Sequence, residues 1–183
     1  HYIVGCPTEI MADGMPYNLL WGELSKVNPD YHSICTNFIN FYSNYKYGNT
    51  PYPYGTISVI DCSQVEGMVN IMKEINASSS LSTVVESDIQ SMDGYIPSIF
   101  YDMGDYVRKL AQNEPQLLTR FNQQLNHLVP EKGNTTSYYT AIRSRSGDVI
   151  PIQTYSGITI SDPSTNLNVT SSLSSNRYYQ ATH

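Results

Sequence analysis

Runs of apolar residues along the chain predict several strands. Residues 2–6 (YIVGC) form an unbroken apolar run, which suits a central strand buried on both faces. Residues 56–60 (TISVI) form a second run of this kind. Three segments near the end are rich in β-branched and aromatic side chains and predict further strands, with Gly147 and Asp148 as a turn: residues 137–142, 149–155 and 156–162.

Apolar residues recur at helical spacing between these predicted strands. Residues 17–27 and 31–45 predict two consecutive helices, and Asp30 is placed to cap the second. A third helix follows residue 60, with Ser63 as a possible cap and an apolar stripe that includes Met68 and Met72.

Two amphipathic segments, residues 98–111 and 115–129, are separated by a short turn. Each carries one apolar stripe, so they predict an antiparallel pair of helices packed face to face. A polar linker at residues 76–82 precedes them. The order of elements therefore indicates an α/β or α+β protein with a helical insertion or subdomain near residues 77–130.

Composition limits the classes of function. The chain has 183 residues, which suits one domain, and its 10 Lys+Arg against 16 Asp+Glu give a net charge of −6. A chain without a basic patch is a poor nucleic-acid binder, and a basic ligand matches it better. No apolar run approaches the ~18 residues of a membrane span, and the start of the chain does not resemble a signal peptide. We expect further chain in front of His1, because the sequence opens on a strand.

Cys62 invites interpretation as a nucleophile, because it follows a strand and Asp61 and precedes a helix. A cysteine nucleophile needs a base, normally histidine. Of the histidines, His1 and His183 are terminal, and His32 and His127 lie in predicted helices. We therefore interpret Cys62 as a small buried residue that closes the strand, with Asp61 capping or flanking the next helix.

Other catalytic and metal-binding patterns are weak. The three cysteines include no CxxC pair, which speaks against zinc, and no G-x-S-x-G occurs. Asp102 and Asp105 could share a cation, but a solvated helix face beside Arg108 and Lys109 is the simpler interpretation. We predict no metal site.

The loop PTEIMADGMPY (residues 7–17) is the strongest candidate for a functional site in the sequence. It follows directly on a predicted buried strand, where open α/β sheets place their clefts. It carries Glu9 and Asp13, with Gly14 to free the backbone. A carboxylate at the base of such a cleft would pair with an arginine or lysine side chain. The alternative is an exposed polar loop without a ligand.

Several stretches together resemble the later part of clostripain-like cysteine peptidases, relatives of caspases and gingipains. They cover nearly the whole chain in family order: YIVGCPTEIMADGMPY, YGTISVIDCSQVEGM, DGYIPSIFYDMGDYVRKLA, IQTYSGITISDP and the terminal YYQATH. The resemblance implies an α/β fold with a caspase-like sheet flanked by helices and a small C-terminal helical subdomain. It divides the chain into a peptidase core (1–76), a helical subdomain (77–130), and returning strands with a tail (131–183).

The same resemblance implies that this chain supplies the specificity pocket rather than the catalytic dyad. The family's catalytic histidine and cysteine would both precede His1, so no catalytic residue is expected here. Asp13 matches an acidic residue of the primary specificity pocket, with Thr8 and Glu9 on the same wall. Cys6 stands where serine is expected, and Met11-Ala12 where Pro-Gly is common, and these departures affect the pocket's shape more than its charge.

The predicted function is therefore the C-terminal chain of a secreted bacterial cysteine endopeptidase that cleaves after arginine or lysine. Its partners would be the N-terminal chain of the same peptidase and peptide substrates. No cofactor is expected, although calcium is possible by resemblance. The alternative is a non-catalytic extracellular module that binds peptides or glycans through the tyrosine-rich residues 42–54.

Overall fold

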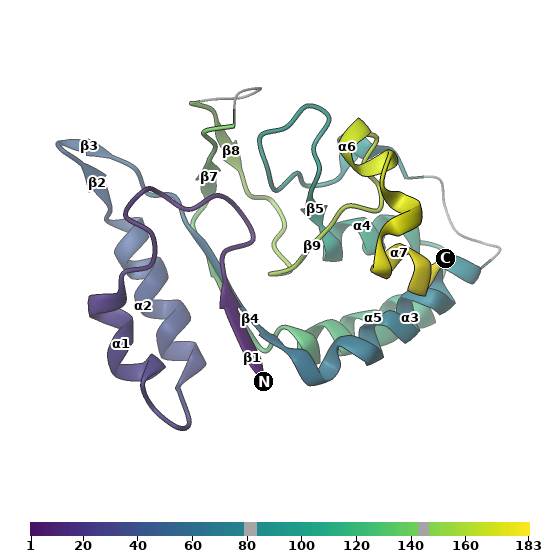
Figure 1. Cartoon of the computed structure of the whole chain (residues 1–183), viewed down its shortest axis with the longest axis horizontal. Helices are drawn as coiled ribbons and strands as arrows, with labels where there is room; N and C mark the ends of the chain where they lie inside the picture. The colour runs from purple at the N-terminus through teal and green to yellow at the C-terminus, as the bar shows by residue number, and fades with distance from the viewer. Residues whose placement is uncertain (79–83, 143–146) are drawn as a thin grey trace.

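A three-stranded sheet organises the computed structural model, which describes residues 1–78, 84–142 and 147–183. Its strand order is β1 (Tyr2–Gly5), β4 (Thr56–Asp61), β6 (Glu131–Asn134). Both pairings are antiparallel, with Val4 opposite Val59 and Ile57 opposite Gly133. Figure 1 shows β1 and β4 side by side between two groups of helices.

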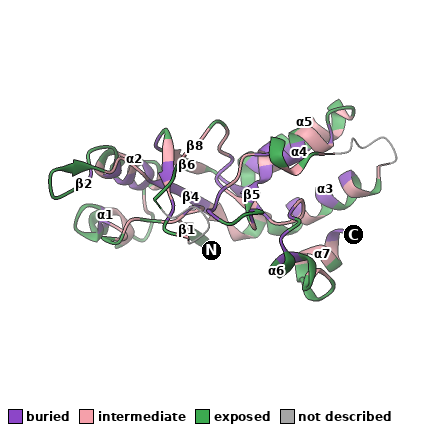
Figure 2. Ribbon diagram, turned by 90° about the horizontal axis from the view of Figure 1, so that it is seen from above, coloured by how far each residue is buried: buried purple, intermediate pink, exposed green. Residues whose placement is uncertain are grey.

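Strand β4 is the buried centre of this sheet. Its residues from Thr56 to Val59 are buried, which fits the apolar run predicted to form a central strand (Figure 2). The same prediction for β1 is wrong: Tyr2 is 48% exposed and Ile3 59%. In the described sheet β1 pairs only with β4, so its other edge and part of its surface stay uncovered.

Helices α1 (Tyr17–Leu24) and α2 (Tyr31–Ser43) cover one face of the sheet. Their buried residues, among them Leu20 and Phe38, form one core cluster with Ile57 and Val59 of β4. As predicted, Asp30 caps α2: its carboxylate accepts a hydrogen bond of 3.1 Å from the backbone N–H of Ser33. The periodicity thus located both helices.

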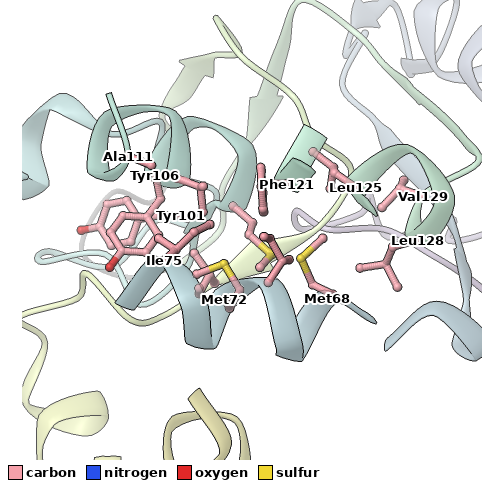
Figure 3. Packing of buried hydrophobic residues seen from close by; sticks show 14 of the residues in the cluster. Met68, Met72, Ile75, Tyr101, Tyr106, Ala111, Phe121, Leu125, Leu128 and Val129 are labelled. Carbon is pink, nitrogen blue, oxygen red and sulfur yellow. The ribbon is translucent and has the colours of Figure 1, made fainter. Parts of the chain in front are cut away.

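Helices α3 (Val65–Ala77), α4 (Met103–Leu110) and α5 (Pro115–Leu128) build a second core cluster with the opposite face of the sheet. The predicted helical pair, α4 and α5, does pack in one cluster, but α3 is the third member and lies along α5. Figure 3 shows their apolar side chains meeting between the helices, with Met68, Met72 and Ile75 from α3 facing Phe121 and Leu125 from α5.

The first helix of that pair is shorter than predicted. Residues 98–102 are not helical, and α4 begins only at Met103, after strand β5 (Tyr101–Asp102). Asp102 fixes this start, because its carboxylate accepts hydrogen bonds from the backbone N–H groups of Asp105 at 2.8 Å and of Ser156 at 2.5 Å. The second bond comes from a segment 54 residues away, which local periodicity cannot reveal.

Three small two-stranded sheets complete the fold. Two of the strands predicted near the end are present as β7 (Ser137–Tyr139) and β8 (Val149–Pro151), which pair as an antiparallel hairpin. Residues 143–146, between these strands, lie outside the described residues. The tyrosine-rich segment forms β2 (Lys46–Tyr47) and β3 (Thr50–Pro51). The segment predicted at residues 156–162 gives only the short β9 (Thr159–Ile160), which pairs with β5.

Short helical elements join and end the chain. They are η1 (Cys62–Gln64), η2 (Glu86–Asp88), α6 (Leu167–Thr170), η4 (Leu173–Ser175) and α7 (Arg177–Thr182). Asp61 caps η1 through a 2.9 Å bond from the N–H of Ser63, so the cap is Asp61 and not Ser63. The predicted linker at residues 76–82 lies partly outside the described residues. Since β6 pairs with β4 and α5 packs on α3, contacts cross the boundaries of the expected three-part division, which stays a prediction.

Phe121 offers a direct test of the second core cluster, because its side chain has no exposed surface. We expect Phe121→Ala to lower the free energy of unfolding by about 3–5 kcal/mol through lost apolar contacts and the cavity left behind. Phe100 is the matched control, since its side chain is 44% exposed and the same substitution removes fewer contacts. Urea denaturation measures both; equal losses would contradict this packing.

Candidate functional site

The loop that the sequence analysis favoured lies at one end of the strands of the central sheet, called here the sheet edge. Strand β1 ends at Gly5, and the loop of residues 6–16, here called the acidic loop, leaves from that end. Because β4 is antiparallel to β1 and to β6, the start of β4 and the end of β6 lie at the same edge, where Thr56 pairs with Asn134. Figure 1 shows this edge next to the β7–β8 hairpin.

Thr8 anchors the acidic loop to β4. It is buried, its backbone N–H donates to Thr56 Oγ1 at 3.2 Å, and the two hydroxyl oxygens lie 2.8 Å apart. A buried hydroxyl needs such a partner, because burying it unpaired is costly. Thr8 therefore holds the loop in place.

Glu9 ties the acidic loop to the end of the β7 strand. Its carboxylate accepts hydrogen bonds from the hydroxyl of Thr140 and, at 2.9 Å, from the backbone N–H of Ala141. Thr140 is fully buried, and Glu9 itself is half-buried. Two donors thus occupy both carboxylate oxygens of Glu9, which makes it a joint between two segments 131 residues apart.

Asp13 is the exposed carboxylate of the loop. Gly14 has a φ of +66°, a backbone conformation that favours glycine, and its carbonyl accepts a 2.5 Å bond from the Tyr42 hydroxyl. A hydrogen bond from Tyr45 to Asp13 raises the pKa of Tyr45. Burial, with smaller contributions that include Asp13, raises the pKa of Tyr42 to about 12. Both tyrosines stay neutral donors that shape the loop around Asp13.

Neither acidic side chain of the loop has a cationic partner within the part of the chain that the structure describes. The described contacts of Asp13 and Glu9 are with hydroxyl and N–H groups. An exposed carboxylate held by neutral donors keeps its negative charge available to a ligand. The chemistry that suits it is a cationic side chain, bound bidentately if that side chain is arginine.

The structure brings the three predicted site residues onto one loop but divides their roles. Thr8 and Glu9 fasten the loop, whereas Asp13 faces solvent. Sequence reasoning missed the residues that hold it, namely Tyr42, Tyr45, Thr56 and Thr140. The tyrosine-rich stretch at residues 42–54 was the available signal, but it was interpreted as a separate surface.

The surroundings of Cys62 do not make it a nucleophile. Its backbone N–H donates to the carbonyl of His1 at 3.0 Å, which extends the β1–β4 pairing. Within the described ranges no hydrogen bond joins Cys62 to a histidine ring; His32 contacts Glu131 and His183 contacts Asp162. Cys62 is half-buried rather than fully buried, and Asp61 caps the following turn as expected.

Asp102 and Asp105 are structural, but not as a solvated helix face. Both are buried, at 1% and 4% exposure, which corrects that interpretation. Asp105 pairs with Arg108 and, at 2.9 Å, with Lys109, and it accepts a 2.7 Å bond from the N–H of Gln90. Burial raises the pKa of Asp102. Across residues 1–78, 84–142 and 147–183, no group of three or more potential metal ligands comes together.

A search of the described helices for a length and apolarity sufficient to cross a membrane finds none.

Comparisons with known proteins agree on one family. The model of the Clostripain family matches residues 1–180. A clostripain from Bacteroides thetaiotaomicron ATCC 29148, solved in complex with the peptide inhibitor BTN-VLTK-AOMK, is 43% identical, with a TM-score of 0.87. The match covers 100% of this chain and 76% of that one. None of the curated proteins compared with the chain matches it.

Two further solved structures are longer than this chain. A secreted C11 cysteine protease from Bacteroides thetaiotaomicron, called iotapain, is 43% identical with a TM-score of 0.87. An inactive zymogen of a C11 protease from Parabacteroides distasonis is 27% identical with a TM-score of 0.82. The whole of this chain is matched in both, but it spans only 48% and 51% of their lengths. These matches confirm the caspase-like α/β fold.

The reactivity of the three thiols tests their placement. Burial raises the pKa of Cys6 to about 11 and that of Cys35 to about 12, so at pH 8 only about a thousandth or less of either is the reactive thiolate. We expect iodoacetamide to modify Cys62 first in the folded chain, as measured by mass spectrometry of peptides. The unfolded chain, in which all three should react alike, is the control. Equal rates at Cys6 and Cys62 in the folded chain would contradict the structure.

Proposed function

The chain belongs to the clostripain family of cysteine peptidases, and from that premise we propose that it forms the specificity pocket of an endopeptidase that cleaves after arginine or lysine. Asp13 would hold the cationic side chain that precedes the cleaved bond. The observation that carries this proposal is an exposed carboxylate without a cationic partner among the described residues, fixed by neighbours at the sheet edge. Its negative charge is complementary to arginine and lysine.

The peptide inhibitor of the Bacteroides clostripain supports the proposed specificity. In BTN-VLTK-AOMK the peptide part, VLTK, ends in lysine next to AOMK. That protein is 43% identical to this chain over the whole of it. A lysine at that position fits an anionic pocket, and the acidic loop supplies an anion.

The proposed catalytic groups lie in another part of the peptidase. This chain spans about half the length of two relatives. Its own thiols are poor candidates, because burial raises the pKa of Cys6 and Cys35 and no described histidine ring is hydrogen-bonded to Cys62. A cysteine thiolate supplied elsewhere would attack the scissile carbonyl, and a histidine would protonate the departing amine. Asp13 would contribute by holding the substrate so that this carbonyl meets the nucleophile.

The rest of the same peptidase is the proposed partner, and β1 is where it would pack. One edge of β1 is unpaired in the described sheet, and Tyr2 and Ile3 expose apolar surface beside it. Unpaired strand edges with apolar side chains are open to pairing with another strand. Covering β1 in this way would restore the central position that its apolar run predicts. Because one relative is described as secreted, we also propose an extracellular or cell-envelope location.

Neutralising Asp13 tests the pocket. In the intact peptidase, Asp13→Asn should lower kcat/KM for arginine- and lysine-containing fluorogenic peptides about a hundredfold or more, because the substrate cation loses its partner. Asp88→Asn is the matched control, since it removes an exposed carboxylate outside the acidic loop. A loss of less than about threefold for Asp13→Asn, with an unchanged melting temperature, would refute the assignment.

A charge on β1 tests the partnership. In the intact peptidase, Ile3→Asp should lower the free energy of unfolding by about 2 kcal/mol or more, because it would place a carboxylate in a covered apolar contact. Val27→Asp serves as the control, since Val27 is 97% exposed and lies outside the sheet. Denaturation curves of the two variants give the comparison. If Ile3→Asp lowers the free energy of unfolding no more than Val27→Asp does, β1 is not covered.

A further inference from the structure

Three tyrosine rings form a compact group at the same sheet edge. We call Tyr52, Tyr54 and Tyr139 the tyrosine cluster. The rings of Tyr54 and Tyr139 stack, with centroids 6.3 Å apart and planes at 22°. Tyr52 meets both edge-on, at 6.2 Å and 6.0 Å. Such contacts hold the rings in a fixed arrangement.

The hydroxyl groups of the tyrosine cluster set it apart from the structural tyrosines. The hydroxyls of Tyr138 and Tyr155, for example, donate to backbone carbonyls of Asp93 and Ile57 at 3.0 Å and 2.9 Å. For the cluster, no hydrogen bond links its hydroxyls to any residue within the described ranges, and all three side chains are only half-buried. Tyr52 also packs against the core cluster of α1, α2 and β4. Tyr54 and Tyr139 are therefore the rings of the cluster whose exposed surface is open to a ligand.

Backbone and side-chain contacts connect the tyrosine cluster to the acidic loop. The N–H of Tyr52 donates to the carbonyl of Tyr45 at 2.9 Å, and the side chain of Tyr45 bonds to Asp13. Tyr139 directly precedes Thr140, which bonds to Glu9. Tyr54 lies two residues before Thr56, the partner of Thr8. Each tyrosine of the cluster thus bonds to, or lies within two residues of, a residue that contacts the loop.

We propose that the tyrosine cluster is a second recognition surface for the same peptide, which takes an apolar side chain close to the basic residue. This inference rests on the proposed function of Asp13. An extended peptide advances about 3.3 Å per residue, so a side chain within a few positions of the basic residue reaches a neighbouring surface. The cluster carries no charge and offers ring faces, so an apolar side chain gains by leaving water there. Asp13 would select the basic residue of the peptide, and the cluster would select an apolar residue close to it in the peptide sequence.

A set of internally quenched peptides tests this surface in the intact peptidase. Each peptide keeps one arginine and otherwise alanine, and leucine replaces alanine at one position from three before to three after the arginine. We expect leucine at one of these positions to raise kcat/KM about tenfold. Tyr139→Ala and Tyr54→Ala should reduce that gain to about twofold or less, where the gain is the ratio of kcat/KM for the leucine peptide to kcat/KM for the all-alanine peptide with the same variant. Tyr139→Phe should keep the gain, because the ring remains.

The controls separate this inference from the proposed pocket. Asp13→Asn should slow the cleavage of every peptide equally and leave the leucine gain intact. Tyr47→Ala should leave the leucine gain unchanged, because Tyr47 is 74% exposed and lies outside the cluster. If Asp13→Asn behaves as expected but the leucine gain survives both cluster variants, the cluster is not a peptide surface. The proposal would also be overturned if leucine gave no gain at any position, or if the cluster bound a glycan instead of the peptide side chain. Melting temperatures of the two alanine variants identify any loss of fold. If an alanine variant does not fold, Tyr54→Leu removes the aromatic ring with a smaller loss of side-chain volume and takes its place in the test.

Discussion

The pairing of β4 on both sides brings the segments of the candidate site together. Antiparallel hydrogen bonding to β1 and to β6 buries the strand from Thr56 to Val59. It also brings the end of β1, the start of β4 and the end of β6 to one edge. The acidic loop and the β7–β8 hairpin begin there, and the tyrosine-rich segment of residues 42–54 ends there. Without that pairing, Thr8 would not meet Thr56, and Glu9 would not meet Thr140.

Two kinds of aspartate in the described chain differ in burial and in role. Asp93 and Asp102 are buried, and their oxygens accept backbone N–H bonds, three for Asp93 and two for Asp102. Such carboxylates are committed to local backbone geometry. Asp13 is exposed and lies on a loop held by other residues. Rigid support with a carboxylate open to solvent is the arrangement expected of a binding residue.

Much of this organisation could be predicted from the sequence, because it depends on local patterns. The periodicity of apolar residues located α2, α3 and α5, and Asp30 identified the start of α2. Contacts between distant segments could not be predicted from local patterns. The start of α4 depends on Ser156, and the anchoring of Glu9 depends on Thr140. The burial of β1 was wrong because an apolar run does not say which strand lies at an edge. For the candidate site, the strand-then-loop pattern pointed to the loop that carries Glu9 and Asp13, and the family resemblance singled out Asp13, but only the fold shows Tyr45 beside it.

The central claim is that Asp13 binds the cationic side chain of a peptide substrate. A crystal structure of the intact peptidase with a peptide inhibitor that ends in lysine measures this most directly. The account predicts a carboxylate oxygen of Asp13 within about 4 Å of the lysine nitrogen, with Glu9 still bonded to Thr140. A lysine nitrogen paired elsewhere, with Asp13 still bonded to Tyr45, would contradict it.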